Sequence, residues 1–195
     1  PGLMVADWPN GEEKVLVNTN NDEHPAAITE FWPSPSGKYV AYGTAVGGSE
    51  LTTIFFVETA TGKKLKDVLV DAAGGTTPPA LAWDADEQGV TYVRLPKDSL
   101  FSASLYHHKL GTESETDREA FGQGLSEVAE WELTTSPGGK MTAALVHFGD
   151  GAPYQLAFQT EDGWKMVVDE EADIRAGGKW VSEGLLAVSH ENAPR

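Results

Sequence analysis

A serine in a glycine-rich stretch is the first residue with the potential for chemistry. The nucleophile elbow of a hydrolase reads Gly-x-Ser-x-Gly and holds its serine on a strained turn between a strand and a helix. The nearest match is Gly47-Gly48-Ser49-Glu50-Leu51, which lacks the final glycine. This stretch also falls in a predicted hairpin rather than before a helix. We therefore interpret it as a turn, and we predict no catalytic residue in this chain.

The spacing of the histidines argues against a metal centre. His107 and His108 are adjacent, so on a strand their side chains lie on opposite faces and cannot bind one ion from the same side. The other histidines, His24, His147 and His190, have no His-x-His or His-Glu-x-x-His spacing. The glycine motifs that bind nucleotide phosphates are also missing from the sequence. We predict no metal and no cofactor.

One pair of carboxylates lies close together in the sequence. Asp84 and Asp86 fall in a short polar segment between two apolar stretches. Aspartate in such a turn commonly accepts hydrogen bonds from the backbone a residue or two later. We therefore expect this pair to stabilise a turn rather than to act as an acid and a base.

Composition limits the partners. The chain has 195 residues, and its 30 acidic and 14 basic residues give a net charge of −16. This charge repels phosphate backbones, so we predict no nucleic-acid partner. No apolar run reaches the roughly 18 residues of a membrane helix, so we predict no membrane partner. The chain lacks cysteine. We expect a soluble protein, with a cytoplasmic location favoured over a periplasmic one.

The fold that positions these serine, histidine and aspartate residues is indicated by a motif that recurs about every fifty residues. In each copy an apolar stretch runs into a polar turn with a glycine, and a second apolar stretch follows. If Gly37, Gly89, Gly139 and Gly184 are equivalent, the spacings are 52, 50 and 45 residues. Repeats of this period with four short strands each indicate a β-propeller. We predict an all-β fold, a partial β-propeller of about three and a half four-stranded antiparallel blades.

The repeats divide the chain into five segments. Residues 1–26 are a lead-in with one short strand at 15–18, and the blades occupy residues 27–70, 78–121 and 125–169. Residues 170–195 form the first half of a further blade. Since a propeller closes with roughly four to eight blades, the chain is expected to be a piece of a larger protein. Its open blade edges are expected to allow self-association.

Tryptophan recurs in the predicted inner strands. We interpret Trp32, Trp83 and Trp131 as recurring at the equivalent position of the inner strand. Most such rings are expected to pack between blades. The alternative is that some face the central pore, where an indole offers a peptide both an apolar face and a hydrogen-bond donor.

These repeats resemble the propeller of the prolyl oligopeptidase family of serine peptidases. The most specific stretch is SLYHHKLGT at residues 104–112, which is similar to the Leu-Tyr-x-His-x-Leu-Gly-Thr stretch of that family. PSGKYVAYG at 35–43, GSELTTI at 48–54 and ETATGK at 58–63 support the resemblance.

The resemblance implies a seven-bladed propeller over an α/β-hydrolase domain that cuts after proline. The propeller would limit access to the active site to short peptides, and the Ser-Asp-His triad would lie outside this chain. The implied partners are the missing hydrolase domain, the remaining blades and a short peptide substrate. Glu50 matches an acidic position that faces the catalytic cavity in the family, although Glu replaces the usual Asp and Leu51 the usual Trp. We take Glu50 and Trp83 as the candidate substrate-facing residues.

Two other functions fit the same pattern. The chain could be a stand-alone propeller-type scaffold for protein interactions, in which case two copies could complete a ring. A β-sandwich binding domain is a third hypothesis, but it does not account for the fifty-residue period.

Overall fold

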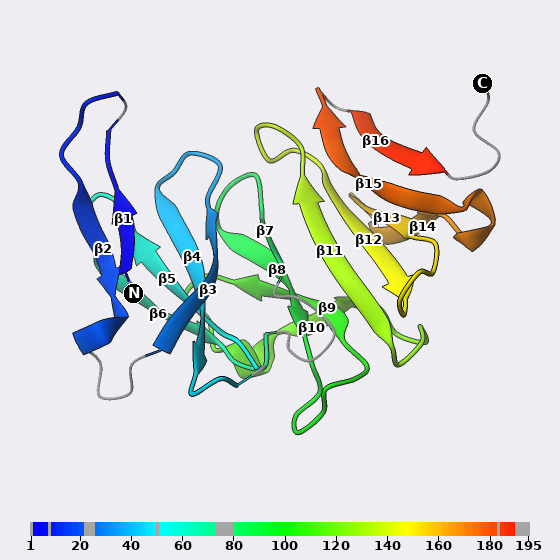
Figure 1. Ribbon diagram of the computed structural model, residues 1–195, viewed down its shortest axis with the longest axis horizontal. Coiled ribbons are helices and arrows are strands. Elements are labelled where there is room, and N and C mark those ends of the chain that lie inside the picture. The colour runs from blue at the N-terminus through cyan, green and yellow to red at the C-terminus, as the bar shows by residue number, and fades with distance from the viewer. Residues whose placement is uncertain are drawn as a thin grey trace.

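A computed structural model describes residues 2–7, 9–21, 26–49, 51–72, 80–182 and 184–189. Three four-stranded antiparallel sheets follow one another in chain order, with a two-stranded sheet at each end of the row (Figure 1). In each complete sheet the strands are neighbours in sequence order, which is the blade pattern of a propeller. No helix in the described ranges is long and apolar enough to cross a membrane.

The strands of the three complete blades have the following bounds. The first blade contains β3 (Ala26–Pro33), β4 (Tyr39–Val46), β5 (Thr53–Glu58) and β6 (Lys64–Leu69). The second contains β7 (Leu81–Trp83), β8 (Gly89–Arg94), β9 (Ser104–Lys109) and β10 (Arg118–Phe121). The third contains β11 (Ala129–Thr135), β12 (Thr142–Phe148), β13 (Gln155–Thr160) and β14 (Gly163–Val168).

The remaining elements lie outside the three complete blades or between their strands. A hairpin of β1 (Gly2–Val5) and β2 (Lys14–Asn18) precedes the first blade, and a hairpin of β15 (Ile174–Val181) and β16 (Gly184–Ser189) follows the third. Three single-turn 3₁₀ helices, η1 (Thr19–Asn21), η2 (Ser114–Thr116) and η3 (Glu170–Ala172), lie between strands.

The turn between the first two strands of each blade is built in the same way three times. The residue that opens the turn donates its backbone N–H to the carbonyl oxygen five residues later, which closes the turn and starts the second strand. These pairs are Ser34–Tyr39, Asp84–Gly89 and Ser136–Met141, with N···O distances of 2.8, 3.0 and 2.8 Å.

The turns show that one predicted equivalence is wrong. The residue three positions after the one that opens the turn is left-handed each time: Gly37 (φ 74°), Glu87 (φ 58°) and Gly139 (φ 75°). In the third turn Gly138 is left-handed as well (φ 85°). Glu87, and not Gly89, is therefore the structural equivalent of Gly37 and Gly139. A non-glycine side chain makes this conformation costly. The Glu87 carboxylate lies across the blade boundary, where it accepts hydrogen bonds from the backbone N–H and, at 2.8 Å, the hydroxyl of Ser36.

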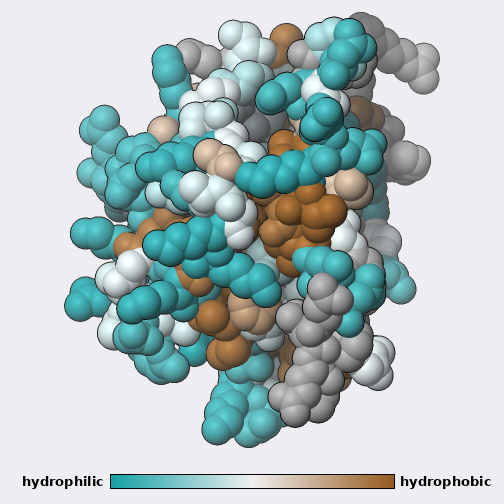
Figure 2. Space-filling model, turned by 90° about the vertical axis from the view of Figure 1, so that its left-hand side faces the viewer, coloured by the Kyte–Doolittle hydropathy of each residue, from teal (hydrophilic) through white to brown (hydrophobic). Residues whose placement is uncertain are grey.

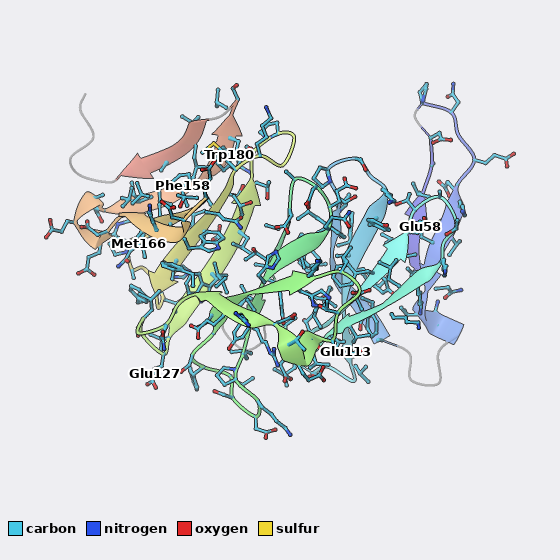
Figure 3. The ribbon with its side chains drawn as sticks, turned by 180° about the vertical axis from the view of Figure 1, so that it is seen from behind. Glu58, Glu113, Glu127, Phe158, Met166 and Trp180 are labelled. Carbon is cyan, nitrogen blue, oxygen red and sulfur yellow. The ribbon has the colours of Figure 1, made fainter. Side chains whose placement is uncertain are left out.

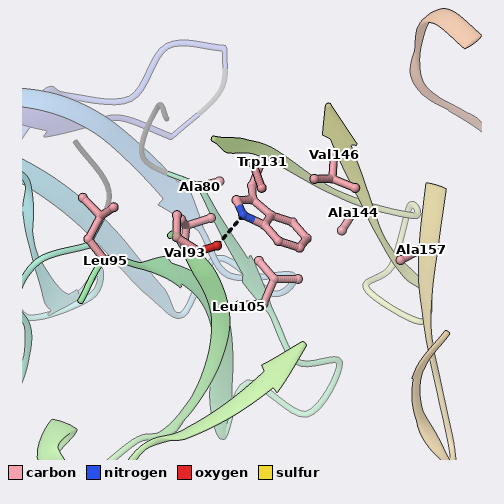
Figure 4. Packing of buried hydrophobic residues seen from close by; sticks show 10 residues of the cluster. Ala80, Val93, Leu95, Leu105, Trp131, Ala144, Val146 and Ala157 are labelled. Carbon is pink, nitrogen blue, oxygen red and sulfur yellow. Dashed lines mark hydrogen bonds between the residues drawn. The ribbon is translucent and has the colours of Figure 1, made fainter. Parts of the chain in front are cut away.

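Aromatic side chains fill the boundaries between blades. Trp131 of β11 is buried against the second blade, where its Nε1 donates to the carbonyl oxygen of Ala103 at 2.9 Å (Figure 4). Phe121 meets this ring edge-on, with 6.0 Å between the centroids. A ring of this size buries about 150–250 Å² of mostly apolar surface, which stabilises the boundary by about 4–6 kcal/mol. The other members of this cluster include Val93, Leu95, Leu105, Ala144, Val146 and Ala157.

The three inner-strand tryptophans are not at one equivalent position, contrary to the prediction. Trp32 lies two residues before its turn, Trp83 directly before its turn, and Trp131 five residues before its turn. The expectation that the rings mostly pack between blades nevertheless agrees with the structure, since Trp83 and Trp131 both contact the preceding blade.

The segment before the first blade contains two strands rather than the single strand predicted. β1 pairs with β2 along its whole length, with Met4 opposite Val15. Residues 2–5 are too short a run to show period-two alternation, so only their pairing with β2 defines them as a strand. The hairpin packs Leu3 and Val5 against β4 and β5, the two middle strands of the first blade. This is the position that the outer strands of a preceding blade would occupy.

The last hairpin lies against the third blade. Trp180 of β15 meets Phe158 of β13 edge-on at 6.3 Å, and its Nε1 donates to the Thr134 hydroxyl at 2.9 Å. Figure 3 shows Trp180 and Phe158 close together, with Met166 of β14 nearby. β15 and β16 thus take the places of the two inner strands of a fourth blade.

Candidate functional site

The first strands of the three blades line an open cavity of about 360 Å³. One end of it is narrow, because a methyl group added at Gly139 would stand 2.9 Å from Pro35 Cγ in the first turn. None of the lining residues is charged, so the wall can bind apolar or neutral groups but offers no acid or base. The lining is Phe31, Trp32, Pro33, Pro35, Leu81, Ala82, Trp83, Leu133, Thr134, Thr135, Ser136, Gly138 and Gly139.

Of the two predicted substrate-facing residues, only Trp83 is described by the structure. Trp83 borders the cavity, but its ring is buried against the first blade. Its Nε1 donates to the carbonyl oxygen of Trp32 at 2.9 Å, Phe56 meets the ring edge-on, and Tyr39 stacks on it at 6.1 Å. Glu50 lies outside the described residues. The roles of Glu50 and Trp83 in contacting substrate stay predictions.

Ser49 is held in a local turn. Its backbone N–H donates to Val46 O at 2.9 Å, and its hydroxyl accepts a hydrogen bond from the Leu51 N–H at 3.1 Å. This agrees with the interpretation of the glycine-rich stretch as a turn. In the part of the chain that the structure describes, the side-chain partners of the histidines are carboxylates, and no histidine contacts a serine hydroxyl.

The strongest polar cluster lies in the family-like stretch at residues 104–112. His108 on β9 is completely buried between the first and second blades. Its Nδ1 lies 2.9 Å from Asp117 Oδ1, and its Nε2 lies 3.1 Å from Asp67 Oδ1. Asp67 belongs to β6 of the first blade and also accepts a hydrogen bond from the Gly111 backbone N–H. One imidazole therefore joins two blades through two buried carboxylates.

A tyrosine completes the cluster on its second-blade side. The Tyr92 hydroxyl donates to Asp117 Oδ2 at 3.0 Å. Burial, together with the charge of Asp117, raises the pKa of Tyr92 far above its usual value, so the hydroxyl remains a donor. Arg94 lies over the Tyr106 ring and donates to Ser114 O at 3.2 Å. With these donors and acceptors paired, the cluster can stabilise the blade boundary, but it is closed to a substrate.

His107 lies on the opposite face of β9, as predicted. Its Nε2 lies 2.8 Å from Asp84 Oδ2, and its side chain is 41% exposed. The hydrogen bond to Asp84 raises the pKa of His107, and partial burial opposes this rise. Gly89 makes room for the pair, since an added Cβ would stand 2.6 Å from Asp84 Oδ2 and 2.9 Å from His107 Nε2. The turn prediction holds for Asp86, which accepts from the Gln88 N–H.

Sequence reasoning missed the partners of His108. Of these partners, only Asp67 could have been noticed in the sequence. It lies between Leu65 and Leu69 on the inward-facing side of an alternating strand, where an apolar residue is expected. An aspartate in an apolar row is expected to have a buried partner. Nothing in the sequence indicates that this partner is 41 residues away.

Comparisons with known proteins agree with this architecture. The family model described as "Prolyl oligopeptidase, N-terminal beta-propeller domain" matches residues 4–140. Prolyl oligopeptidase A of Galerina marginata is 28% identical in an alignment 138 residues long, which covers 60% of this chain and 19% of that protein. Prolyl oligopeptidase ophP of Omphalotus olearius is 27% identical in an alignment 130 residues long, which covers 59% of this chain and 17% of that protein. The chain thus spans less than a fifth of the length of these curated relatives.

Solved structures share the fold. A prolyl endopeptidase structure superposes with a TM-score of 0.80 at 21% identity, covering 96% of this chain and 28% of that one. Prolyl oligopeptidase B from Galerina marginata superposes with a TM-score of 0.69 at 23% identity, covering 82% and 25% of the two chains. The predicted all-β partial propeller is confirmed. Because the family model covers well over half of the sequence, this chain belongs to the prolyl oligopeptidase family, in which it matches the N-terminal β-propeller domain.

Proposed function

We propose that this chain is a non-catalytic part of the propeller of a prolyl-oligopeptidase-like serine peptidase, and that it gates the access of short proline-containing peptides to a hydrolase domain. The family match carries the proposal. In the homologues the propeller packs against an α/β-hydrolase domain, which is absent here. The activity belongs to that domain, and the propeller supplies a wall that a peptide must pass.

The cavity between the inner strands supports this role. Its aromatic and proline side chains offer neutral, apolar surface, and a prolyl ring packs well on such groups. The hydroxyl of Thr135 borders the same space and can bond to peptide groups. We assign Trp83 to this wall and Glu50 to the side that faces the catalytic cavity.

A succinyl-Gly-Pro chromogenic peptide tests whether the chain binds a proline-containing peptide and whether it lacks catalysis. The chain is expected to bind the peptide, seen as a change in tryptophan fluorescence, and to release no chromophore. Phe31 lines the cavity and is 54% exposed, so Phe31→Ala should weaken binding by about 1 kcal/mol, or roughly fivefold in Kd. Phe101→Ala is the matched control, because Phe101 is 51% exposed and lies outside the cavity lining.

Two results would contradict the proposal. Equal Kd values for the Phe31 and Phe101 variants would show that the peptide does not bind in the cavity. Turnover of the peptide that disappears in Ser49→Ala would place catalysis in this chain.

A further inference from the structure

An open pocket of about 390 Å³ lies between the second and third blades, and its wall carries mostly polar side chains. Turns of the two blades meet at one side of it, since a methyl group added at Gly139 would stand 3.5 Å from Ala85 Cα. The polar lining residues are Asp84, Lys140, Thr142, Gln159, Thr160 and Glu161. The pocket therefore suits a charged or polar ligand rather than an apolar one.

The pocket lies at the end of the blades that carries the turns between strands one and two and between strands three and four. The loop between β4 and β5 lies at the opposite end, to which the proposed function assigns the catalytic cavity, so the pocket stays accessible when a hydrolase domain is bound. Both blades that form the pocket are complete, and it lies away from the first hairpin, where apolar side chains gather among hydrophilic ones (Figure 2). It shares only Gly139 with the cavity between the inner strands.

The second blade departs from the packing of its neighbours at this boundary. Three positions of each blade can be compared: the residue that closes the first turn, the residue two later, and the third-strand residue opposite the latter. They are Tyr39, Ala41 and Phe56 in the first blade, Gly89, Thr91 and His107 in the second, and Met141, Ala143 and Phe158 in the third. In the first blade the two large side chains pack on Trp83 of the next blade. The second blade has a glycine and a histidine instead, which leaves space for polar groups.

The hydrogen bonding behind the pocket is incomplete within the chain. The hydroxyl of Thr91 is buried and has no hydrogen-bond partner among the described residues. Thr91 lies opposite His107 on the neighbouring strand, so the two side chains share one face of the sheet. A buried hydroxyl without a partner is costly, and such groups are usually satisfied by water or by a ligand. This part of the blade boundary can therefore accept polar groups from outside the chain.

Asp84 supplies a carboxylate that is already held in position. Its Oδ2 lies 2.8 Å from His107 Nε2, and its backbone carbonyl accepts a hydrogen bond from the Glu87 N–H at 3.0 Å. The Asp84 side chain is 26% exposed, so a ligand in the pocket can reach it. A carboxylate fixed in this way loses little conformational freedom when it binds an ammonium group.

Two opposite charges line the pocket without neutralising each other. Lys140 follows the first turn of the third blade, and Glu161 lies in the turn between β13 and β14. Among the described residues neither side chain forms an ion pair, whereas the nearby Lys165 pairs with Asp162 at 3.2 Å. A wall that presents an unpaired cation and an unpaired anion is complementary to a ligand that carries both charges.

We propose that this pocket binds a small zwitterion, namely a free amino acid or a dipeptide with unblocked ends. The Lys140 ammonium group binds the ligand's carboxylate, and the carboxylates of Glu161 and Asp84 bind its ammonium group. Contacts of this kind are charge-assisted hydrogen bonds, which are stronger than neutral ones. The Thr160 hydroxyl donates to Gly163 O at 2.7 Å, which leaves its oxygen free to accept a bond from a peptide N–H.

Glycylglycine is the probe, and NMR signals of the His107 imidazole, identified by their absence in His107→Gln, report its binding. We expect a saturable shift with a Kd of about 1 mM, the affinity of a ligand with few atoms. N-acetyl-glycylglycine lacks the ammonium group and glycylglycinamide lacks the carboxylate. Each blocked peptide should bind about three- to tenfold more weakly, because one charge-assisted contact is lost. A succinyl-Gly-Pro peptide has no ammonium group, so its binding in the cavity between the inner strands is a separate measurement.

Two variants assign the charges of the ligand to residues of the pocket. Lys140→Gln should remove the preference for glycylglycine over glycylglycinamide, because the partner of the carboxylate is gone. Glu161→Gln should reduce the preference over N-acetyl-glycylglycine for the corresponding reason. Lys165→Gln and Asp162→Asn are the matched controls, since these two residues pair with each other outside the pocket lining, and both should bind like the unmodified chain.

Three results would overturn the proposal. The first is the lack of a saturable shift at glycylglycine concentrations well above the expected Kd. The second is equal affinity for the free and the blocked peptides, which would show that the charges of the ligand are not recognised. The third is a loss of affinity in the control variants as large as that in Lys140→Gln, which would place the effect outside the pocket.

Discussion

Replacing His108 by alanine should destabilise the protein more than any other single histidine substitution. His108 is completely buried, and its two ring nitrogens contact Asp67 and Asp117, whose side chains are also nearly inaccessible. Removing the imidazole leaves two buried carboxylates without the hydrogen-bond partner that they share. Removing one partner from a buried polar cluster of this kind costs about 3–5 kcal/mol. This is a large fraction of the 5–15 kcal/mol that typically separates folded and unfolded states.

Urea unfolding followed by tryptophan fluorescence measures the loss in the free energy of unfolding. The matched control is His107→Ala, one residue away on the same strand. His107 has a single carboxylate partner and is 41% exposed, so its removal should cost only about 0–1 kcal/mol. Adding Asp67→Asn to His108→Ala should recover part of the loss, because one unpaired charge is removed. Such coupling typically amounts to about 0.5–3 kcal/mol.

Two outcomes would refute this reasoning. If the free energies of unfolding fall equally in the two histidine variants, the buried contacts contribute no more than the exposed one. If Asp67→Asn adds its full cost to that of His108→Ala, the two side chains are energetically independent, and the cluster does not join the blades.

The remaining predictions concern the neighbouring pair of Asp84 and His107. Gly89→Ala should lower the free energy of unfolding by about 1–3 kcal/mol, because the new methyl group would stand 2.6 Å from the Asp84 carboxylate and 2.7 Å from a backbone oxygen. Gly184→Ala is the control and should cost much less, because its nearest neighbour is 3.4 Å away. Equal losses in the two variants would show that Gly89 is not in a crowded position. Since the hydrogen bond raises the pKa of His107 above 6.5, its contribution is complete below that pH and is lost as the pH rises through the folded-state pKa. The stability difference between the unmodified chain and Asp84→Asn should therefore shrink between pH 6 and pH 9 in thermal unfolding scans, and a difference that grows over this range would show that the sign is wrong.

Much of the fold follows from patterns that act over a few residues. Proline, serine and glycine favour the first and third inner turns, and glycine supplies the left-handed conformation that closes them. Alternating apolar residues then define the strands on each side. Because each blade is made of strands that are neighbours in sequence, recognising the turns is almost enough to recognise the blade. The all-β fold and the family were predictable for this reason.

The same local reasoning fails where one blade meets the next. It assigned the second turn to Gly89, whereas Glu87 adopts the left-handed conformation and reaches Ser36 of the neighbouring blade. It also treated Trp32, Trp83 and Trp131 as equivalent. Nothing within a turn reveals that a glutamate there has a partner in another repeat that can offset its backbone strain.

The sequence by itself determined the repeating strands, the turns that join them and the family to which they belong, because alternation and turn preference are properties of short segments. Only the tertiary structure decided that His108 joins Asp67 to Asp117, that Gly89 makes room for a second histidine pair, and that β1 and β2 form a hairpin on the first blade. These features depend on how twisted sheets stack. Stacking brings together side chains that are tens of residues apart, and no short segment encodes it alone.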